Sequence, residues 1–307
     1  DHVRYNGPYC QKLGYHPYGR WNDKTYESRG DWADETLARL ERWGFNMLAA
    51  TYDASLLRRG LAHTEMLHIG SRLGKMDEEY YITPHEGRPC SAFPNVFHPD
   101  FEAFCRYSAR RQCARHAHDP WLFGYFLDNE LAWWGRGDLE TGLFDAVMTL
   151  PAEHTAKQAL LDHLRNRYPS AEALNRAWET NAESFDAIAE RQKLTGMQRE
   201  TVIRDKSDFA RMIAERYFRC VTEAIRAADP NHMILGCRFA GGRASEKVWR
   251  TAGTYCDILT LNYYGNVDPD RGVALSHGRL AAACPLPEAF AEFQRMGGRP
   301  LMVTEWS

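Results

Sequence analysis

The sequence lacks three features that would each point to a particular class of protein. Its eight cysteines include no Cys-x-x-Cys pair, and Cys237 and Cys256 fall inside apolar runs typical of buried strands. Free cysteines in such runs behave as small hydrophobic residues, so we expect neither a zinc cluster nor a disulfide framework. No apolar run approaches the roughly 20 residues needed to cross a bilayer. The net charge of −3 gives no basic surface for nucleic acid or an anionic membrane.

The composition that remains is that of an ordinary globular protein. The 307 residues are 44% hydrophobic and 26% charged, with no bias toward disorder. One domain of about 250 residues with insertions accounts for the length, and an α/β barrel is typical at that size. The first residue is Asp1 rather than methionine, which is compatible with the removal of a signal peptide or a leading domain. A secreted or periplasmic protein would fit, but the sequence indicates no localisation and no oligomeric state.

Short apolar runs alternate with amphipathic patterns along the chain, which is typical of βα units around a parallel sheet. We expect strands at about 9–14, 45–51, 65–70, 121–127, 233–237, 256–261 and 301–304. The clearest of them is 121–127, because it is nearly all apolar, as a strand buried on both faces should be. Helices are expected at about 31–40 (closed by Gly44), 99–119, 155–168, 170–180 and 207–228.

These elements predict an α/β protein with a (β/α)₈ TIM-type barrel. Residues 1–307 would form a single catalytic domain, with a helical insertion at about 135–205 after the fourth strand. Only seven strands are found, because the chain stops at Ser307, two residues after Glu305. A sheet left open there would expose unpaired edges. We therefore expect the natural polypeptide to continue beyond Ser307 with an eighth strand and a helix.

Two glutamates end strands of the predicted barrel, where barrel enzymes build their active sites. Glu130 follows the 121–127 strand, and Glu305 ends the last one. Glycoside cleavage needs two carboxyl groups flanking one bond, about 5–5.5 Å apart in retaining enzymes. Because strand ends meet at one side of a barrel, these two carboxylates could meet at that range. The alternative is that both are ordinary rim carboxylates in ion pairs.

Other side chains at the strand ends suit a sugar site. Asn129 could donate to a sugar hydroxyl near the reacting carbon. Tyr263 could donate to an ionised carboxylate, and Arg238 could stabilise it with positive charge. The remaining candidates are Asn262, at the same strand end as Tyr263, and the flat apolar faces of Trp133, Trp134 and Trp306. Core packing is the alternative for the tryptophans.

Several motifs resemble known glycoside hydrolases. Leu-Asp-Asn-Glu-Leu-Ala-Trp-Trp at 127–134 resembles the Asn-Glu motif that ends strand four in clan A, and Val-Thr-Glu-Trp-Ser at 303–307 resembles the strand-seven nucleophile motif. Four stretches resemble the family 50 β-agarases and, more loosely, the family 42 β-galactosidases. They are 124–130, 167–178, 227–240 and 256–264. The resemblance implies that Glu130 is the acid/base, that Glu305 is the nucleophile, and that Asn129 and Tyr263 belong to the subsite of cleavage.

Two departures from the family pattern leave the substrate open. The nucleophile motif is Thr-Glu-Trp-Ser instead of the Gly-Glu-Phe-His associated with the agarases, and the zinc-binding cysteine cluster of many family 42 enzymes is not evident. A sister family acting on another β-galactoside or related polysaccharide is therefore an alternative.

The sequence thus predicts a retaining β-glycoside hydrolase that acts on a galactose-containing polysaccharide or oligosaccharide by double displacement. Its partner would be the carbohydrate, with no nucleic acid or membrane and with no cofactor or metal. A β-galactosidase-like enzyme on small β-galactosides is one alternative, and a non-catalytic carbohydrate-binding barrel is another. A metal-dependent barrel enzyme is disfavoured, because it would need carboxylates at several neighbouring strand ends, where Arg238 and Asn262 stand instead.

Overall fold

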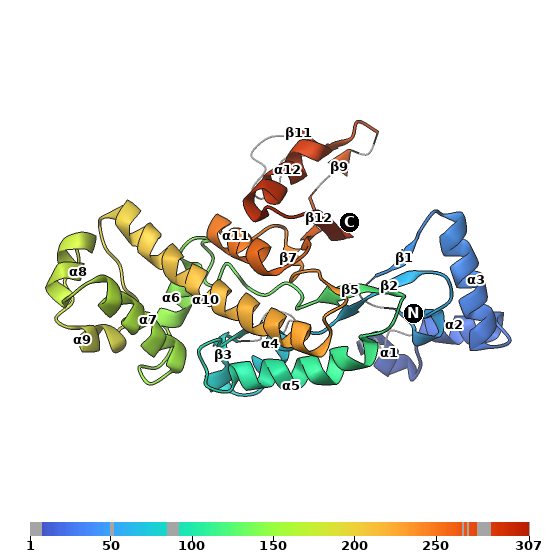
Figure 1. The fold of residues 1–307 in the computed structure, drawn as a ribbon, viewed down its shortest axis with the longest axis horizontal. Helices are drawn as coiled ribbons and strands as arrows, with labels where there is room; N and C mark the ends of the chain where they lie inside the picture. Colours follow the sequence, from blue (N-terminus) through green and yellow to red (C-terminus); the bar gives the residue numbers. More distant parts are fainter. Residues whose placement is uncertain are drawn as a thin grey trace. The chain divides into compact units, whose positions relative to one another are not determined.

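The computed structural model describes residues 8–49, 52–84, 92–265, 267–268, 270–274 and 284–306. The chain divides into two compact units (Figure 1). The first comprises Asp1–Met66 and His118–Gly124, and the second comprises Leu67–Ala117 and Tyr125–Ser307. Both units combine helices with strands, so the fold is mixed α/β, as expected. All the site residues expected from the sequence lie in the second unit.

The first unit begins with three helices and continues with two parallel strands. Its elements are α1 (Pro8–Leu13), α2 (Pro17–Thr25), α3 (Arg29–Arg42), β1 (Met47–Leu48), the 3-10 turn Ala54–Leu56 and β2 (Ala62–Met66). The side chain of Ser28 caps α3, and Gly44, at φ +78°, follows its last turn, which confirms the predicted helix end. Ala33, Leu48 and Leu56 form the small core of this unit.

Two expected strands of the first part of the chain are corrected. Residues 9–13 lie in α1 instead of a strand and Gly14 follows the helix, which starts at Pro8, a residue whose fixed φ suits the first helical position. The strand expected at 65–70 lies earlier, as β2, and Ile69 already begins the short helix α4 (Ile69–Leu73). The strand expected at 45–51 is reduced to β1, and its last two residues lie outside the described ranges.

Parallel strands carry the predicted site in the second unit. Backbone bonds join β5 (Leu122–Phe126) to the segment after β6 (Met233–Ile234), with Leu235 N donating to the Tyr125 carbonyl at 2.8 Å. A separate parallel sheet has the order β12 (Leu301–Trp306), β8 (Leu259–Tyr263), β7 (Phe239–Ala240). The expected strands at 121–127, 256–261 and 301–304 are thus confirmed. Among the described residues, however, the strands form several separate sheets and not one closed sheet.

Smaller antiparallel pairs complete the strands of the second unit. They are β3 (Tyr81–Thr83) with β4 (Phe93–Pro94), and β10 (Val273–Ala274) with β9 (Val267–Asp268) and β11 (Cys284–Pro285).

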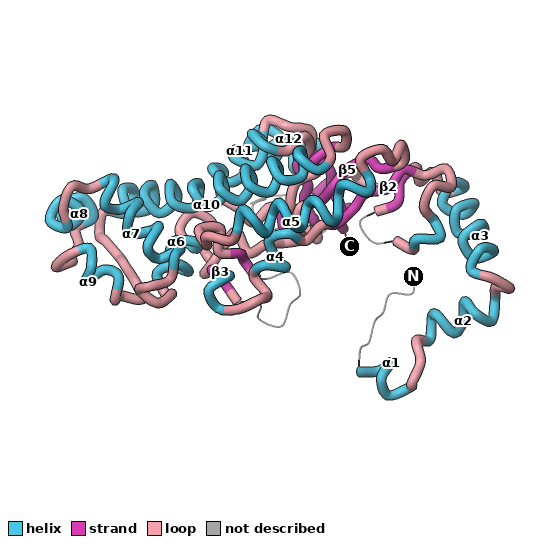
Figure 2. The backbone as a smooth tube through the Cα atoms, turned by 60° about the horizontal axis from the view of Figure 1, so that its bottom comes forward, coloured by secondary structure: helices cyan, strands magenta, loops and turns pink. Residues whose placement is uncertain are grey.

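Long helices pack around one another beside these strands. Helix α10 (Arg199–Ala228) lies against α5 (Phe101–Cys113) on one side and α11 (Glu246–Tyr255) on the other, and α12 (Leu286–Gly297) packs on α11 (Figures 1 and 2). The apolar face of α10 is fully buried at Phe209, Ile213, Phe218 and Val221, as its periodicity predicts. The helix begins at Arg199, earlier than the expected residue 207.

Four shorter helices lie beside the N-terminal turns of α10. Helices α6 (Gly142–Met148), α7 (Thr155–Arg167), α8 (Ala171–Trp178) and α9 (Phe185–Ala189) gather at the N-terminal end of α10 (Figure 2). The fully buried carboxylate of Asp205 accepts hydrogen bonds from Trp178 Nε1 at 2.8 Å and from the Tyr168 hydroxyl, and it pairs with Arg167 at 2.8 Å. Asp205 therefore joins α7 and α8 to α10. The helices expected at 155–168 and 170–180 are confirmed.

The other end of α10 is tied to the strand that leads to Glu130. Asp229, directly after the helix, accepts from the Tyr125 hydroxyl of β5 at 2.5 Å, from His232 Nδ1 at 2.7 Å and from Asn231 N at 2.9 Å. Burial opposes ionisation of this carboxyl, yet these bonds hold the pKa of Asp229 below its usual range. Asp229 thus links the C-terminal end of α10 to β5.

Candidate active site

The segment after β5 is anchored by a buried carboxylate. Asp128 is fully buried and accepts hydrogen bonds from Gly70 N at 2.7 Å, Ser71 N at 2.9 Å and the Tyr217 hydroxyl at 2.7 Å. Only glycine fits at position 70, because a Cβ there would lie 2.8 Å from Asp128 Oδ2. These bonds satisfy a charge that would otherwise be costly to bury, and they fix the start of the segment that carries Asn129 and Glu130.

Two residues of the site hold left-handed backbone conformations. Glu130 has φ +54° and Arg238 has φ +47°, and Glu130 N donates to the Arg238 carbonyl at 3.3 Å. A left-handed conformation costs a side-chain-bearing residue on the order of 1–3 kcal/mol and persists where the surroundings enforce it. The two strand ends are therefore held in contact at the expense of local strain, which is a common feature of active sites.

A β-bulge sets the direction of the Glu305 side chain. In the parallel pair of β12 and β8, Val303 is opposite Leu261, but Glu305 is opposite Asn262, so Thr304 is one extra residue on β12. Because side chains alternate across a strand, this shift places Glu305 and Asn262 on the same face.

One asparagine contacts both predicted catalytic glutamates. The Asn262 side chain is fully buried, and its Nδ2 donates to Glu130 Oε1 at 2.8 Å and to Glu305 Oε2 at 3.0 Å. Those two carboxylate oxygens therefore cannot be farther apart than the sum of the two distances, 5.8 Å. The structure thus brings Glu130, Glu305 and Asn262 together at one point.

Arg238 brings positive charge to Glu305. Arg238 Nη2 pairs with Glu305 Oε2 at 2.8 Å, and its Nη1 donates to Asn129 Oδ1 at 2.6 Å. Arg238 is buried, and the Cζ atom of its guanidinium lies over the Phe126 ring, 5.6 Å from the ring centre. The pair with Glu305 is therefore shielded from solvent on the arginine side, unlike an ion pair between two exposed rim residues. Asn129 is oriented by the same guanidinium.

The tyrosine that contacts Glu305 is Tyr264, one residue after the expected Tyr263. Burial and a hydrogen bond to Glu305 both raise the pKa of Tyr264. Tyr263 is buried, with its ring 5.2 Å from that of Phe290. Within β8 (Leu259–Tyr263), alternation predicts that Tyr263 lies on the face opposite to Asn262, and Tyr264 is the first residue after the strand. The place of Tyr264 directly after Tyr263, at the same strand end, was the signal available in the sequence.

His68 is a second residue near the site that the sequence reasoning missed. It follows β2, in a left-handed conformation at φ +55°. Burial is the main cause that lowers the pKa of His68; the charge of Asp128 opposes this shift, and that of Arg238 adds to it. The sequence reasoning places His68 inside the strand expected at 65–70, and its position beyond the strand end follows only from the observed bounds of β2.

The three tryptophans differ in position. Trp133 is fully buried, stacked on Phe218 at 5.4 Å and edge-on to Phe93 at 4.8 Å, so its ring has no exposed face for a sugar and matches the core-packing alternative. Trp134 is half-buried, with the guanidinium of Arg243 4.2 Å above its ring. The side chain of Trp306 lies outside the described residues.

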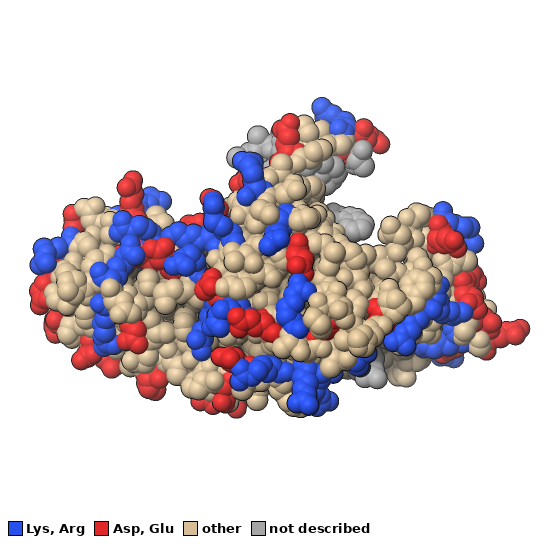
Figure 3. Space-filling view, viewed as in Figure 1, with Lys and Arg blue, Asp and Glu red and all other residues tan. Residues whose placement is uncertain are grey.

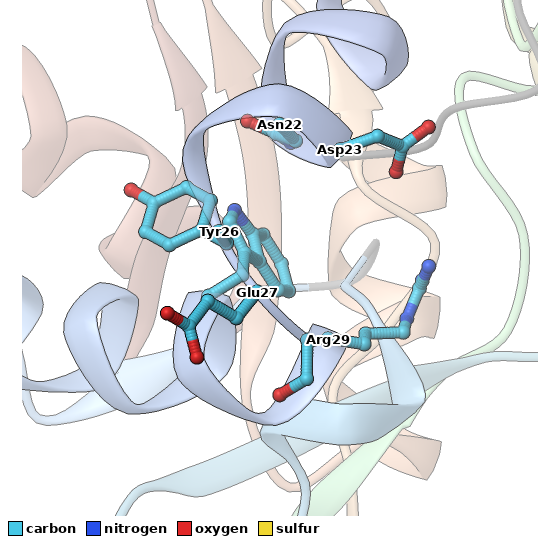
Figure 4. A pocket seen from close by; sticks show the side chains of 7 residues that line it. Asn22, Asp23, Tyr26, Glu27 and Arg29 are labelled. Carbon is cyan, nitrogen blue, oxygen red and sulfur yellow. The ribbon is translucent and has the colours of Figure 1, made fainter.

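A pocket in the first unit offers no such pair of carboxylates. It has a volume of about 190 Å³ and lies where α2 meets α3, lined by Asn22, Asp23, Tyr26, Glu27, Ser28, Arg29 and Trp32. The carboxylates of Asp23 and Glu27 point in different directions, and Arg29 is paired with Asp53 (Figure 4). Its geometry does not suit general acid/base chemistry on one bond.

In the described ranges, no group of three or more His, Cys, Asp or Glu side chains is arranged to hold a metal ion. Within the described residues, no helix is both long enough and apolar enough to cross a membrane. On the face shown in Figure 3, basic and acidic side chains are interspersed.

Comparison with known proteins adds independent information. No model of a known protein family matches the chain. β-Agarase A of Vibrio sp. (strain JT0107) is 27% identical over 274 residues, which cover 85% of this chain. β-Agarase B of the same source is 23% identical over 246 residues, or 78% of this chain. The chain is similar to β-agarases. It spans about a quarter of the length of these two curated relatives, 27% and 25% respectively.

Solved structures share the fold. PfGH50B has a TM-score of 0.71 at 22% identity, covering 90% of this chain and 37% of that chain. An exo-β-agarase has a TM-score of 0.68 at 24% identity, covering 95% and 36%. A β-galactosidase from the psychrophilic Marinomonas ef1 has a TM-score of 0.56 at 16% identity, covering 91% and 46%. The expected resemblance to the family 50 β-agarases is confirmed, and the mixed α/β fold resembles both agarases and β-galactosidases.

Proposed function

We propose that the protein is a retaining β-glycoside hydrolase that acts on a galactose-containing polysaccharide, with Glu305 as nucleophile and Glu130 as general acid/base. The observation that carries the proposal is the Asn262 amide, which contacts one oxygen of each glutamate. These two oxygens are therefore no more than 5.8 Å apart. Retaining enzymes need carboxyl groups about 5–5.5 Å apart, whereas inverting enzymes need about 6.5–9.5 Å to accommodate a water molecule. The short separation favours the retaining arrangement.

The contacts of the two glutamates support different roles. Arg238 and Tyr264 both contact Glu305, and a cation together with a hydroxyl donor stabilises the negative charge that a nucleophile must carry. Glu130 accepts a hydrogen bond from the neutral Asn262 amide, a contact that brings no positive charge to the proposed general acid. Asn129, held by Arg238, lies next to Glu130 and is placed to contact the sugar that is cleaved.

The reaction then proceeds in two displacements. A Glu305 oxygen bonds to the anomeric carbon while the glycosidic C–O bond breaks, and its electron pair goes to the leaving oxygen, which takes the proton of Glu130. Water next attacks the anomeric carbon and gives a proton back to Glu130, while the bond to Glu305 breaks. Each displacement inverts the anomeric carbon, so a β-linked substrate gives a β-configured product.

The substrate class and the complete barrel are part of the same proposal. The similarity to two proteins named β-agarases supports a β-linked galactan as the substrate. We further propose that the parallel strands belong to a (β/α)₈ barrel, because the two glutamates stand at strand ends, where barrel enzymes build their active sites. In that barrel β5 and β12 would be the fourth and seventh strands, and α6–α9 would be the insertion after the fourth. We propose Asn129, Arg238, Asn262 and Trp134 as the substrate-binding side chains, while Tyr263 and Trp306 remain expectations from the sequence.

A substrate screen tests the proposed function. The full natural polypeptide is incubated with oligosaccharides of agarose, porphyran, carrageenan and galactan, and with a nitrophenyl β-galactoside, and the products are identified by mass spectrometry. We expect cleavage of at least one galactan, and none by a matched Glu130→Gln/Glu305→Gln variant. Binding without cleavage of any substrate would contradict the proposal and favour a carbohydrate-binding barrel.

A further inference from the structure

Thr304 occupies an unusual place in the site. It is the extra residue of the β-bulge that brings Glu305 opposite Asn262. Bulges are frequent beside active sites, where they re-aim a side chain. The proposed catalytic roles of the two glutamates do not explain the hydroxyl of Thr304.

The hydrogen-bond partners of that hydroxyl have fixed roles. Thr304 Oγ1 lies 2.9 Å from Asn262 Oδ1, 3.2 Å from the Leu261 carbonyl and 3.3 Å from Arg238 Nε. An amide oxygen can only accept and a guanidinium nitrogen can only donate, while a hydroxyl has one proton to give. Thr304 must therefore accept from Arg238, and its one proton goes to the nearer acceptor, Asn262 Oδ1.

This bond and the two carboxylates together fix which end of the Asn262 amide faces the glutamates. With Oδ1 held by Thr304, Nδ2 is the end that donates to Glu130 and Glu305. A flipped amide would place its oxygen about 3 Å from both carboxylate oxygens in a buried position, where like partial charges repel strongly. Arg238, held by the same hydroxyl, reaches the Glu305 carboxylate with Nη2.

We propose that Thr304 is a positioning residue that fixes the amide orientation of Asn262 and the place of Arg238, and through them the Glu305 carboxylate. The proposal rests on the function proposed above. Thr304 itself does not touch the substrate in this account. It acts by satisfying the polar groups that contact the nucleophile, so its contribution is to turnover and not to substrate affinity.

The test compares three variants of the full natural polypeptide on the agarose oligosaccharide. Thr304→Val keeps the shape but removes the hydroxyl, and Thr304→Ser keeps the hydroxyl. Thr251→Val is the matched control, because it removes a buried hydroxyl that donates to the Lys247 carbonyl of its own helix. We expect Thr304→Val to lower kcat about tenfold with less than a twofold change in KM, since one buried hydrogen bond is worth about that factor. Thr304→Ser should restore kcat to within about twofold of the wild type, and Thr251→Val should not change it.

A second readout does not depend on activity. The Asn262 side-chain NH₂ signals, followed by ¹⁵N NMR, should be protected from exchange in the wild type and in Thr304→Ser, and should lose protection in Thr304→Val. If the wild-type protein cleaves nothing, the proposed function fails, while these signals still decide the role of Thr304. Unchanged kcat and unchanged amide protection in Thr304→Val would overturn the inference. Equal losses in the serine and valine variants would also overturn it, because they would indicate a purely structural residue.

Discussion

Replacing Glu305 with alanine is expected to abolish turnover on every substrate, by on the order of 10⁵-fold or more, the scale seen when a covalent nucleophile is removed. The reason is that no other group in the site can form the glycosyl-enzyme intermediate. Arg238, Asn262 and Tyr264 all contact Glu305, but none of them offers a carboxylate oxygen to the anomeric carbon. The measurement is kcat on the natural oligosaccharide and on a dinitrophenyl β-glycoside.

The control for this variant is Glu288→Ala, which removes an exposed glutamate of α12 and should leave kcat unchanged. Azide provides a further check, because the alanine variant leaves space where the carboxylate stood. A small anion entering that space attacks the activated glycoside from the nucleophile's side and gives an α-glycosyl azide. A Glu305→Ala enzyme that retained even a hundredth of wild-type turnover would exclude Glu305 as the nucleophile.

Replacing Glu130 with alanine should affect substrates unequally. A natural sugar leaving group needs a proton, and a positioned general acid contributes about 10²–10⁴-fold to its departure. A dinitrophenolate leaves without a proton, so the first displacement on that substrate should be much less affected. The second displacement remains slow, because Glu130 must then accept a proton from water. Rapid-mixing kinetics should therefore show a burst of phenolate followed by slow turnover.

Azide should rescue the Glu130 variant in a different way from the Glu305 variant. It needs no general base, so it attacks the glycosyl-enzyme directly and gives a β-glycosyl azide. If the β-azide came from the Glu305 variant and the α-azide from the Glu130 variant, the two roles would be exchanged. Equal losses on natural and dinitrophenyl substrates would show that Glu130 is not the general acid.

The convergence of the two glutamates could be predicted from the sequence, because it depends on strand ends. Glu130 and Glu305 each follow a clear apolar run, and the ends of parallel strands lie at one edge of a sheet. The amide of Asn262 contacts both, in agreement with that expectation. The contact with Tyr264 was missed, since its selection over Tyr263 depends on which face of β8 Asn262 occupies.

The bulge at Thr304 could not be predicted in this way. A bulge adds one residue to a strand without changing its apolar pattern, so periodicity gives no sign of it. Trp133 packs against the rings of Phe93 and Phe218, which lie far from it in the sequence. Its burial therefore depends on tertiary packing. The segment 9–14 is short and mixes apolar with polar residues, and periodicity alone does not separate a strand from a helix at that length.

The anomeric configuration of the first-formed product tests the central claim most directly. The account places Glu130 and Glu305 as a retaining pair, with their Asn262-bound oxygens no more than 5.8 Å apart. Proton NMR of a β-linked galactan oligosaccharide, recorded within the first minutes of cleavage, should show the β-anomer appearing first and the α-anomer only later, by mutarotation. An α-anomer appearing first would contradict the double-displacement mechanism and the assignment of Glu305 as its nucleophile.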